Sequence, residues 1–314
     1  MRRCLITYEE VAEDEHYSGV GLRKLSPRLT SLAELPYSAE EQRRESAIRV
    51  GRMSIQGMQP KLSACLEAGA GRFKIVDTGG RYLIKPQNSP YPELPENEDL
   101  TMRLAEIAGI ETPLHGLLRS RDGSRSYFIR RFDRQGKRKF AVEDFAQLAG
   151  GSRETKYDSS VEKIFGLLRY CTFPVVECVR LYRRCLFNFL VGNEDMHLKN
   201  YSVITRGRRT ELAPAYDYLN SVATYLQIGT LLDDIEETAL PVRGRKRKLK
   251  RSDWVDYLAL ERLQIQEVAA NRILSELEAC QKEWSRLIEI SFLSKEAKQI
   301  YRDVLARRRD TLFG

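Results

Sequence analysis

A short polar segment in the second half of the chain carries the residue types best suited to chemistry. Asp195, Lys199 and Asn200 lie within residues 191–202, between an apolar run typical of a helix and a run typical of a strand. Loops between elements often hold catalytic groups. In the spacing Asp-x-x-x-x-Asn, the carboxylate can accept a proton from an attacking hydroxyl while the amide oxygen binds Mg²⁺. A lysine beside them can neutralise a phosphoryl group during transfer, so the segment predicts phosphoryl transfer.

Two other regions could supply the rest of such a site. Asp217 follows Asn200 after two short strand-like runs and could be the second oxygen ligand that Mg²⁺ needs. Lys85 ends a strand-like run and could bind ATP phosphates. The helix that follows offers Glu98 as the ion-pair partner of this lysine, with Glu106 as the less favoured choice. Glu98 could instead only complement the helix dipole.

Each of these signals is weak when taken singly. A lone lysine at a strand end is usually a surface residue. His197 is assigned to the nucleotide-binding side of the site, although a single histidine is more often structural. The order of Lys85, Asp195, Asn200 and Asp217 along the chain, each on a suitable type of element, is what predicts a kinase.

The elements expected to position these residues differ between the two parts of the chain. The pattern of residues 1–135 predicts strands and one clear helix over 97–108. Within this part, the strand-like runs 72–76 and 81–85 flank a hairpin signal. Residues 136–314 predict mainly helices. We therefore predict an α+β, two-lobed, protein-kinase-like fold. Its β-rich N-lobe would contact the ATP phosphates, and its helical C-lobe would carry the catalytic loop and metal site.

The usual protein-kinase signatures are absent from the sequence, which has no G-x-G-x-x-G, His-Arg-Asp or Asp-Phe-Gly. The motifs present instead are residues 54–62, 97–105, 130–134 and 192–202, together with Tyr216 and Asp217. They resemble the HipA family of bacterial toxin kinases. The resemblance implies a kinase fold that uses ATP and Mg²⁺, with Asp195 as the catalytic base. It also implies Asn200 and Asp217 as metal ligands and Lys85 as the phosphate-binding lysine.

The same resemblance gives a role to the loop Ser54, Ile55, Gln56 and Gly57. In the family this loop covers the ATP phosphates, and its serine can be autophosphorylated, which makes Ser54 the candidate. A phosphate would add roughly two negative charges, which would repel the ATP phosphates or withdraw the loop. The alternative for Ser54 is a loop hydroxyl that bonds nearby backbone.

The motifs come earlier in the chain than in full-length HipA, as if an N-terminal subdomain were absent. This layout is similar to the short HipT type of kinase from tripartite HipBST toxin–antitoxin systems. That resemblance implies a small HipS-like protein and a DNA-binding HipB-like antitoxin as partners. It implies phosphorylation of a serine in a protein, expected to be an aminoacyl-tRNA synthetase, free or tRNA-bound, so that translation stops. The alternatives are a small-molecule kinase of the aminoglycoside or choline type and a pseudokinase binding module.

The composition sets further limits. The net charge of +8 over 314 residues favours a polyanionic partner, but we expect no sequence-specific DNA binding by the chain itself. The densest basic run, Arg243 to Arg251, is either a solvated loop or a docking patch. No apolar run reaches the roughly 18 residues of a membrane span, and no signal peptide is apparent, which predicts the bacterial cytoplasm.

The six cysteines form no C-x-x-C pair, which argues against a zinc site. Cys171, Cys178 and Cys185 recur at helical spacing and are expected to be small buried hydrophobes.

Overall fold

The structure is a computed structural model that describes residues 2–49, 59–136, 138–151 and 154–314. It divides into two compact units by the density of contacts. The first comprises Met1–Asp99, Pro113–Arg131 and Ile290–Phe292, and the second comprises Leu100–Thr112, Phe132–Glu289 and Leu293–Gly314. The domain boundary expected at residue 135 stays a prediction.

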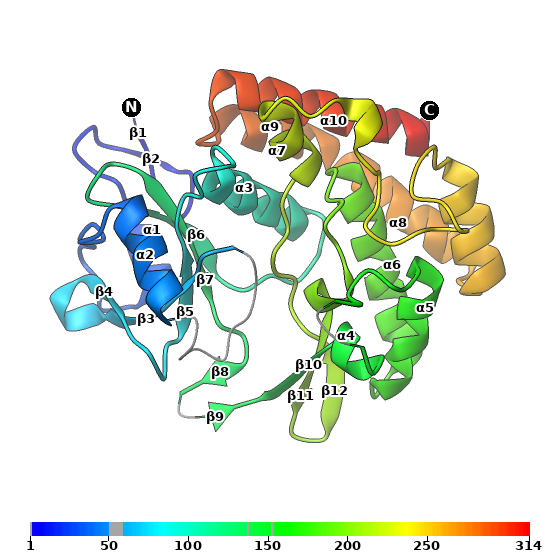
Figure 1. The fold of residues 1–314 in the computed structure, drawn as a ribbon, viewed down its shortest axis with the longest axis horizontal. Coiled ribbons are helices and arrows are strands. Elements are labelled where there is room, and N and C mark those ends of the chain that lie inside the picture. The colour runs from blue at the N-terminus through cyan, green and yellow to red at the C-terminus, as the bar shows by residue number, and fades with distance from the viewer. Residues whose placement is uncertain (1, 50–58, 137, 152–153) are drawn as a thin grey trace. The chain divides into compact units, whose positions relative to one another are not determined.

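A five-stranded antiparallel sheet forms the centre of the first unit (Figure 1). Its strands lie in the order β4-β3-β5-β7-β6. Its core includes a cluster of aromatic rings from Phe73, Tyr82 and Phe128, with centroids 5.0–6.1 Å apart. The strands are β3 (Leu62–Glu67), β4 (Arg72–Ile75), β5 (Tyr82–Lys85), β6 (His115–Arg119) and β7 (Arg125–Arg130).

The hairpin expected between residues 72–76 and 81–85 is wrong, because β3 lies between β4 and β5 and pairs with both. The segment that joins them crosses the end of β3, where the Val76 N–H donates to the carbonyl of Ser63 at 2.9 Å. Gly80 permits this crossing, because a Cβ at that position would lie 1.9 Å from the Ser63 Oγ. The glycine that resembled a hairpin signal instead allows a close approach between chain segments.

The N-terminal part of the chain forms two short strands and two helices of the first unit. Ser18 caps α1 by accepting a hydrogen bond from the Gly21 N–H. Gln42 of α2 is fully buried, donating to Ser120 and accepting from Ser126, both at 2.9 Å. These elements are β1 (Arg2–Arg3), β2 (Glu10–Val11), α1 (Gly19–Leu25) and α2 (Ala39–Arg49).

Helix α3 (Leu94–Ile107) begins earlier than the helix expected from Asn97. Pro95 occupies its second position, and proline is tolerated in the first turn because the N–H groups there have no intrahelical acceptor. The proline therefore lies inside the helix, and the start expected at Asn97 was three residues too late.

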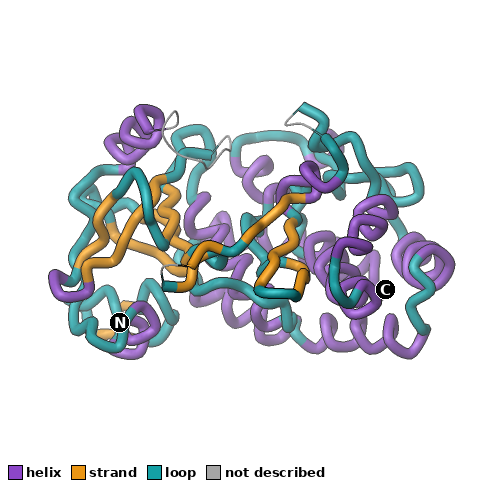
Figure 2. The backbone as a smooth tube through the Cα atoms, turned by 90° about the horizontal axis from the view of Figure 1, so that it is seen from below, coloured by secondary structure: helices purple, strands orange, loops and turns teal. Residues whose placement is uncertain are grey.

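The second unit is mainly helical, and Figure 2 shows its helices in purple with a small sheet in orange. Its longest helix, α10, packs against α6 and α7. Large buried aromatics such as Phe187, Trp254 and Trp284 fill its core. The α-helices are α4 (Phe145–Leu148), α5 (Val161–Gly166), α6 (Pro174–Leu190), α7 (Ser221–Gln227), α8 (Glu267–Ala279), α9 (Gln281–Ile290) and α10 (Lys295–Phe313), and Asp253–Arg262 is a π-helix.

A three-stranded sheet in the order β10-β11-β12 completes the second unit. Its middle strand follows the predicted catalytic loop directly, and its first strand runs into the capped helix α4. The strands are β10 (Ala141–Asp144), β11 (Ser202–Arg206) and β12 (Arg209–Leu212). A separate two-stranded antiparallel sheet consists of β8 (Arg134–Gln135) and β9 (Arg138–Lys139).

All six cysteines are free thiols. Cys171 and Cys185 are buried, as expected, whereas Cys178 is partly exposed. Among the residues that the structure describes, no three His, Cys, Asp or Glu side chains gather as a metal cluster. No described helix is both long and apolar enough to span a bilayer.

Candidate active site

The predicted catalytic loop begins where α6 ends at Leu190. Gly192 turns the chain with φ of +70°, and its carbonyl accepts a hydrogen bond from the Val222 N–H at 3.1 Å. Buried Asn193 then donates to the Asn188 Oδ1 at 2.9 Å. The loop is thus fixed to α6 and to the start of α7 before it reaches Asp195.

Asp195 and Asn200 are held together by the turn between them. The main-chain oxygen of Asp195 accepts from the His197 N–H at 2.8 Å and from the Asn200 Nδ2 at 2.9 Å. With the amide nitrogen of Asn200 used in this way, Oδ1 is the atom of that side chain left to act as a ligand. Carbonyl and carboxylate oxygens are what Mg²⁺ prefers.

The carboxylate of Asp195 has two aromatic neighbours. The Tyr157 hydroxyl donates to Oδ1 at 2.6 Å, and the His197 Nε2 lies 3.9 Å from the same oxygen. The two rings meet edge to face at 5.1 Å. Burial lowers the pKa of His197 against the opposing effect of the Asp195 charge. Burial and the Asp195 carboxylate both raise the pKa of Tyr157, so its hydroxyl stays protonated and remains a donor.

Asp217 is tied to the catalytic loop through the residue before it. The Tyr216 hydroxyl donates to the Lys199 carbonyl at 2.9 Å, and because it has one proton, its hydrogen bond with Ser202 is donated by the serine. The Tyr216 ring also stacks on Phe132, with centroids 5.6 Å apart. Asp217 has φ of +57°, an uncommon conformation for a residue with a side chain and one that often marks a functional position.

In the first unit, Lys85 and Glu98 form a buried ion pair. The Lys85 Nζ donates to the Glu98 Oε1 at 2.5 Å, and the two side chains are 4% and 0% exposed. The ammonium group also lies 5.5 Å from the centre of the Tyr127 ring. The alternative partner, Glu106, is exposed and accepts from the Thr112 hydroxyl at 2.8 Å.

The predicted site residues therefore form two clusters, each within its own unit. Lys85 and Glu98 lie together in the first, and Asp195, His197 and Asn200 lie together in the second, with Lys199 in the same turn. The loop Ser54, Ile55, Gln56 and Gly57 lies outside the described residues, so its role stays a prediction.

Sequence reasoning missed two residues near Asp195. Tyr157 gives no signal in the sequence, because it lies far from the catalytic loop along the chain. Glu194 adjoins Asp195 but was not predicted as a site residue. Burial and then the Asp195 charge raise its pKa to about 7, against a hydrogen bond from Tyr225 and the charge of Lys246.

Three side chains of the basic run Arg243 to Arg251 contact other parts of their own unit. Arg245 pairs with buried Asp253 at 2.6 Å, Lys246 pairs with Glu236 at 2.9 Å, and Arg251 donates to the Leu312 carbonyl at 2.6 Å. Most residues of the run nevertheless remain exposed, so both interpretations, a solvated loop and a docking patch, stay predictions.

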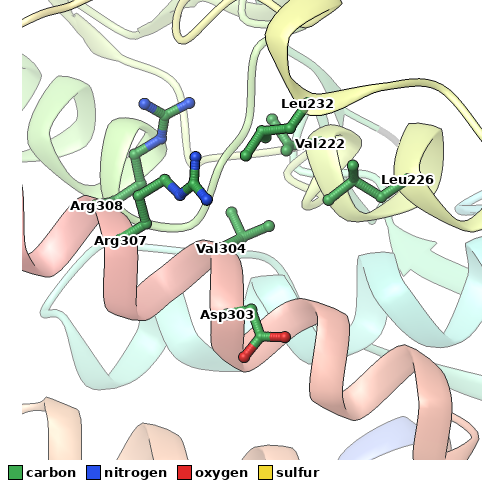
Figure 3. A pocket seen from close by; sticks show the side chains of 7 residues that line it. All are labelled: Val222, Leu226, Leu232, Asp303, Val304, Arg307 and Arg308. Carbon is green, nitrogen blue, oxygen red and sulfur yellow. The ribbon is translucent and has the colours of Figure 1, made fainter.

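A small cavity of about 60 Å³ lies between α7 and α10. Figure 3 shows Val222 and Leu226 facing Val304 across it, with Arg307 and Arg308 projecting from α10 at its side. None of the predicted site residues that the structure describes lines this cavity, and its lining offers no reactive constellation.

The chain is similar to several bacterial kinases. It is 31% identical to a Haemophilus influenzae protein named "Putative kinase", over 78% of this chain and 75% of that protein. It is 28% identical to the Shewanella oneidensis serine/threonine-protein kinase toxin HipA, over 58% of this chain. It spans only 47% of the length of that toxin.

Solved structures share the fold. The Shewanella oneidensis HipA in a complex with HipB and operator DNA aligns with a TM-score of 0.68 at 21% identity, over 90% of this chain and 73% of that one. The Helicobacter pylori proinflammatory kinase CtkA aligns with a TM-score of 0.58 at 14% identity, over 82% of this chain and 90% of that one. The predicted α+β kinase-like fold is confirmed. Residues 53–284 match the HipA-like C-terminal domain, and the chain belongs to that family.

Proposed function

We propose that this chain is a protein kinase that transfers the γ-phosphate of ATP to a serine of another protein. The observation that carries the proposal is the turn in which the Asn200 amide closes on the Asp195 carbonyl at 2.9 Å. One short loop thereby holds a carboxylate for the acceptor hydroxyl and an amide oxygen for a metal ion. The kinase names of the relatives support this proposal.

The chain's own residues divide the work as follows. Asp195 accepts the proton of the acceptor hydroxyl, and Lys199 neutralises charge on the transferring group. Lys85, oriented by Glu98, binds the ATP phosphates. His197 would contribute to nucleotide binding. Asn200 and Asp217 hold Mg²⁺, and their oxygen donors fit this cation, which when bound neutralises the charge of the phosphates.

The finer assignments rest on family resemblance. We propose that Ser54 is autophosphorylated within the Ser54 to Gly57 loop, and that the chain is of the HipT type. Its partners would be a HipS-like protein and a HipB-like, DNA-binding antitoxin. The solved HipA complex contains HipB and operator DNA. Its target would be an aminoacyl-tRNA synthetase, whose phosphorylation would stop translation.

The test is incubation of the purified chain with γ-labelled ATP, Mg²⁺ and a bacterial lysate. Asp195→Asn removes the base with little change in shape. Asp310→Asn changes an exposed aspartate of α10, 74% exposed, and is the matched control. Label on one lysate protein with wild type and Asp310→Asn, absent with Asp195→Asn, would support the proposal, and mass spectrometry would identify the target serine. Label on a metabolite instead would indicate a small-molecule kinase, and no ATP turnover would indicate a binding module.

A further inference from the structure

The hydroxyl of Tyr157 occupies the position on Asp195 that an acceptor hydroxyl needs. A general base must lie about 2.6–3.2 Å from the atom whose proton it removes. The distance from the Tyr157 Oη to the Asp195 Oδ1 is 2.6 Å. This tyrosine therefore meets, within the chain itself, the first geometric requirement for a phosphoacceptor.

The backbone beside Tyr157 is fastened to the catalytic loop. The carbonyl of Lys156 accepts from the Leu198 N–H at 3.1 Å, and the Tyr157 ring lies edge to face against His197. The contact with Asp195 is thus supported from the main chain and from the ring. The phenol is consequently delivered to the base in cis, without a second molecule.

The surroundings of the ring also suit a phosphorylated product. The residue is 40% exposed, so solvent reaches part of it. The Lys156 and Lys246 ammonium groups lie 4.8 and 5.9 Å from the ring centre. A tyrosine phosphate carries roughly two negative charges, and these two cations would compensate part of that charge.

We propose that Tyr157 is a phosphoacceptor of this chain, distinct from Ser54, and that it is modified in cis. The inference rests on the proposed kinase function. In the reaction the phenolic oxygen forms a bond to the γ-phosphorus of ATP, the bond from that phosphorus to ADP breaks, and the phenolic proton passes to the Asp195 carboxylate. Once Asp195 has released that proton to solvent, its carboxylate and the phosphorylated side chain repel each other, and the side chain moves away from the base.

The first test is incubation of the whole chain with γ-labelled ATP and Mg²⁺, followed by alkali and by mass spectrometry. Phosphotyrosine survives alkali, whereas phosphoserine is eliminated. Tyr170 is 45% exposed in the same unit, so Tyr170→Phe is the matched control for Tyr157→Phe. We expect alkali-stable label on Tyr157 in wild type and in Tyr170→Phe, and loss of this label in Tyr157→Phe. The fraction of protein phosphorylated per unit time should not change when the protein is diluted, because the reaction occurs within one molecule.

The second test needs no ATP. Tetranitromethane nitrates the phenolate form of tyrosine, so Tyr157 should react more slowly than Tyr170 in the untreated chain. Asp195→Ala removes the hydrogen-bond acceptor and the negative charge that keep the Tyr157 hydroxyl protonated. The nitration rate of Tyr157 should then rise by roughly tenfold or more, because a fall of one unit in the pKa of its hydroxyl gives about tenfold more phenolate at a fixed pH.

The outcomes separate this inference from the kinase proposal. Phosphate on serine residues or on a lysate protein, with none on Tyr157, would overturn the inference and leave the kinase standing. Phosphate on Tyr157 that forms faster at higher protein concentration would overturn the claim of a reaction in cis. No ATP turnover at all would overturn both proposals. An unchanged nitration rate in Asp195→Ala would contradict the contact on which the inference stands.

Discussion

The side-chain nitrogen of Asn200 donates a hydrogen bond of 2.9 Å to the main-chain oxygen of Asp195. The residue proposed to bind Mg²⁺ therefore also closes the turn that carries the proposed base. Both functions use the same amide group, one atom for each. A substitution at this position can thus disturb the metal and the loop together, and the two effects can be separated by experiment.

Asn200→Asp should weaken Mg²⁺ binding although it adds a negative charge. The new carboxylate has no N–H for the Asp195 carbonyl, so two oxygens would face each other and the turn would open. Loss of a contact that orients a ligand typically costs 10–100-fold in metal affinity. We expect the Mg²⁺ concentration for half-maximal phosphoryl transfer to rise by roughly that factor. Asn271→Asp, an exposed change on α8, is the control, and an unchanged Mg²⁺ dependence would contradict the assigned role of Asn200.

Lys85→Met should destabilise the first unit as well as abolish activity. It leaves the Glu98 carboxylate buried without the ammonium group 2.5 Å away, and breaking a buried ion pair in this way costs about 3–5 kcal/mol. Urea unfolding would measure the loss. Lys74→Met is the matched control, because Lys74 forms an exposed pair with Glu67 at 3.7 Å, and such pairs contribute about 0–1 kcal/mol.

A second substitution separates folding from function at the same pair. Lys85→Met combined with Glu98→Leu replaces both charges by apolar groups, which is often close to neutral in stability. The double variant should recover most of the lost free energy of unfolding while ATP-dependent phosphorylation stays absent. Recovery of activity together with stability would show that the pair is only structural.

The fold was predictable where a local pattern determines it. The apolar run before residues 191–202 predicted a helix, and α6 ends there at Leu190. The pairing of β4 and β5 was not predictable, because nothing in residues 72–85 indicates that Leu62–Glu67 lies between them. Consecutive strands are often but not always neighbours in a sheet, and a turn signal alone does not decide which strands pair.

The same distinction applies to the site. Asp195 and Asn200 contact each other within one turn, so their spacing in the sequence was enough to predict both as site residues. Tyr157 reaches Asp195 from a segment before α5, and only the tertiary structure places its hydroxyl on the carboxylate. Glu194 adjoins the predicted base, but its altered pKa depends on burial, which the sequence does not give.

Glu194 should make stability depend on pH in an unusual direction for a carboxyl group. Its pKa is raised from 4.5 to about 7 in the folded chain. Between these values the unfolded chain has lost the proton and the folded chain retains it, so raising the pH favours unfolding. The contribution is fully present below about pH 4.5 and is lost as the pH rises through about 7. At about 1.4 kcal/mol per pH unit it amounts to about 3 kcal/mol at most.

Glu194→Gln cannot ionise and should remove this dependence. Its free energy of unfolding should exceed that of wild type most clearly above about pH 7, with the difference vanishing near about pH 4.5. Urea unfolding at several pH values would measure it. Glu278→Gln on α8, an exposed position, should leave the profile unchanged. Parallel profiles for wild type and Glu194→Gln would show that Glu194 ionises at its ordinary pH in the folded chain.

Gly192→Ala tests whether packing against α10 and α7 holds the catalytic loop in place. The backbone at Gly192 has φ of +70°, and an added Cβ would lie 2.6 Å from the Val304 Cγ1 and 2.9 Å from the Asn220 Oδ1. The left-handed conformation costs a non-glycine residue roughly 1–2 kcal/mol, and overpacking adds about 1–3 kcal/mol. We expect a loss of stability of about 2–5 kcal/mol and reduced kinase activity, because α7 and the loop before Asp195 would both shift.

Two further variants assign that loss to its causes. Gly207 has a similar φ of +64°, but a Cβ there would meet nothing within 4 Å. Gly207→Ala should therefore show only the conformational cost and leave activity intact. Val304→Ala removes the methyl group nearest to the new Cβ, so Gly192→Ala should cost less in that background than in wild type, with the difference measured by a double-mutant cycle. Equal costs for Gly192→Ala and Gly207→Ala would show that the loop is not held by this contact.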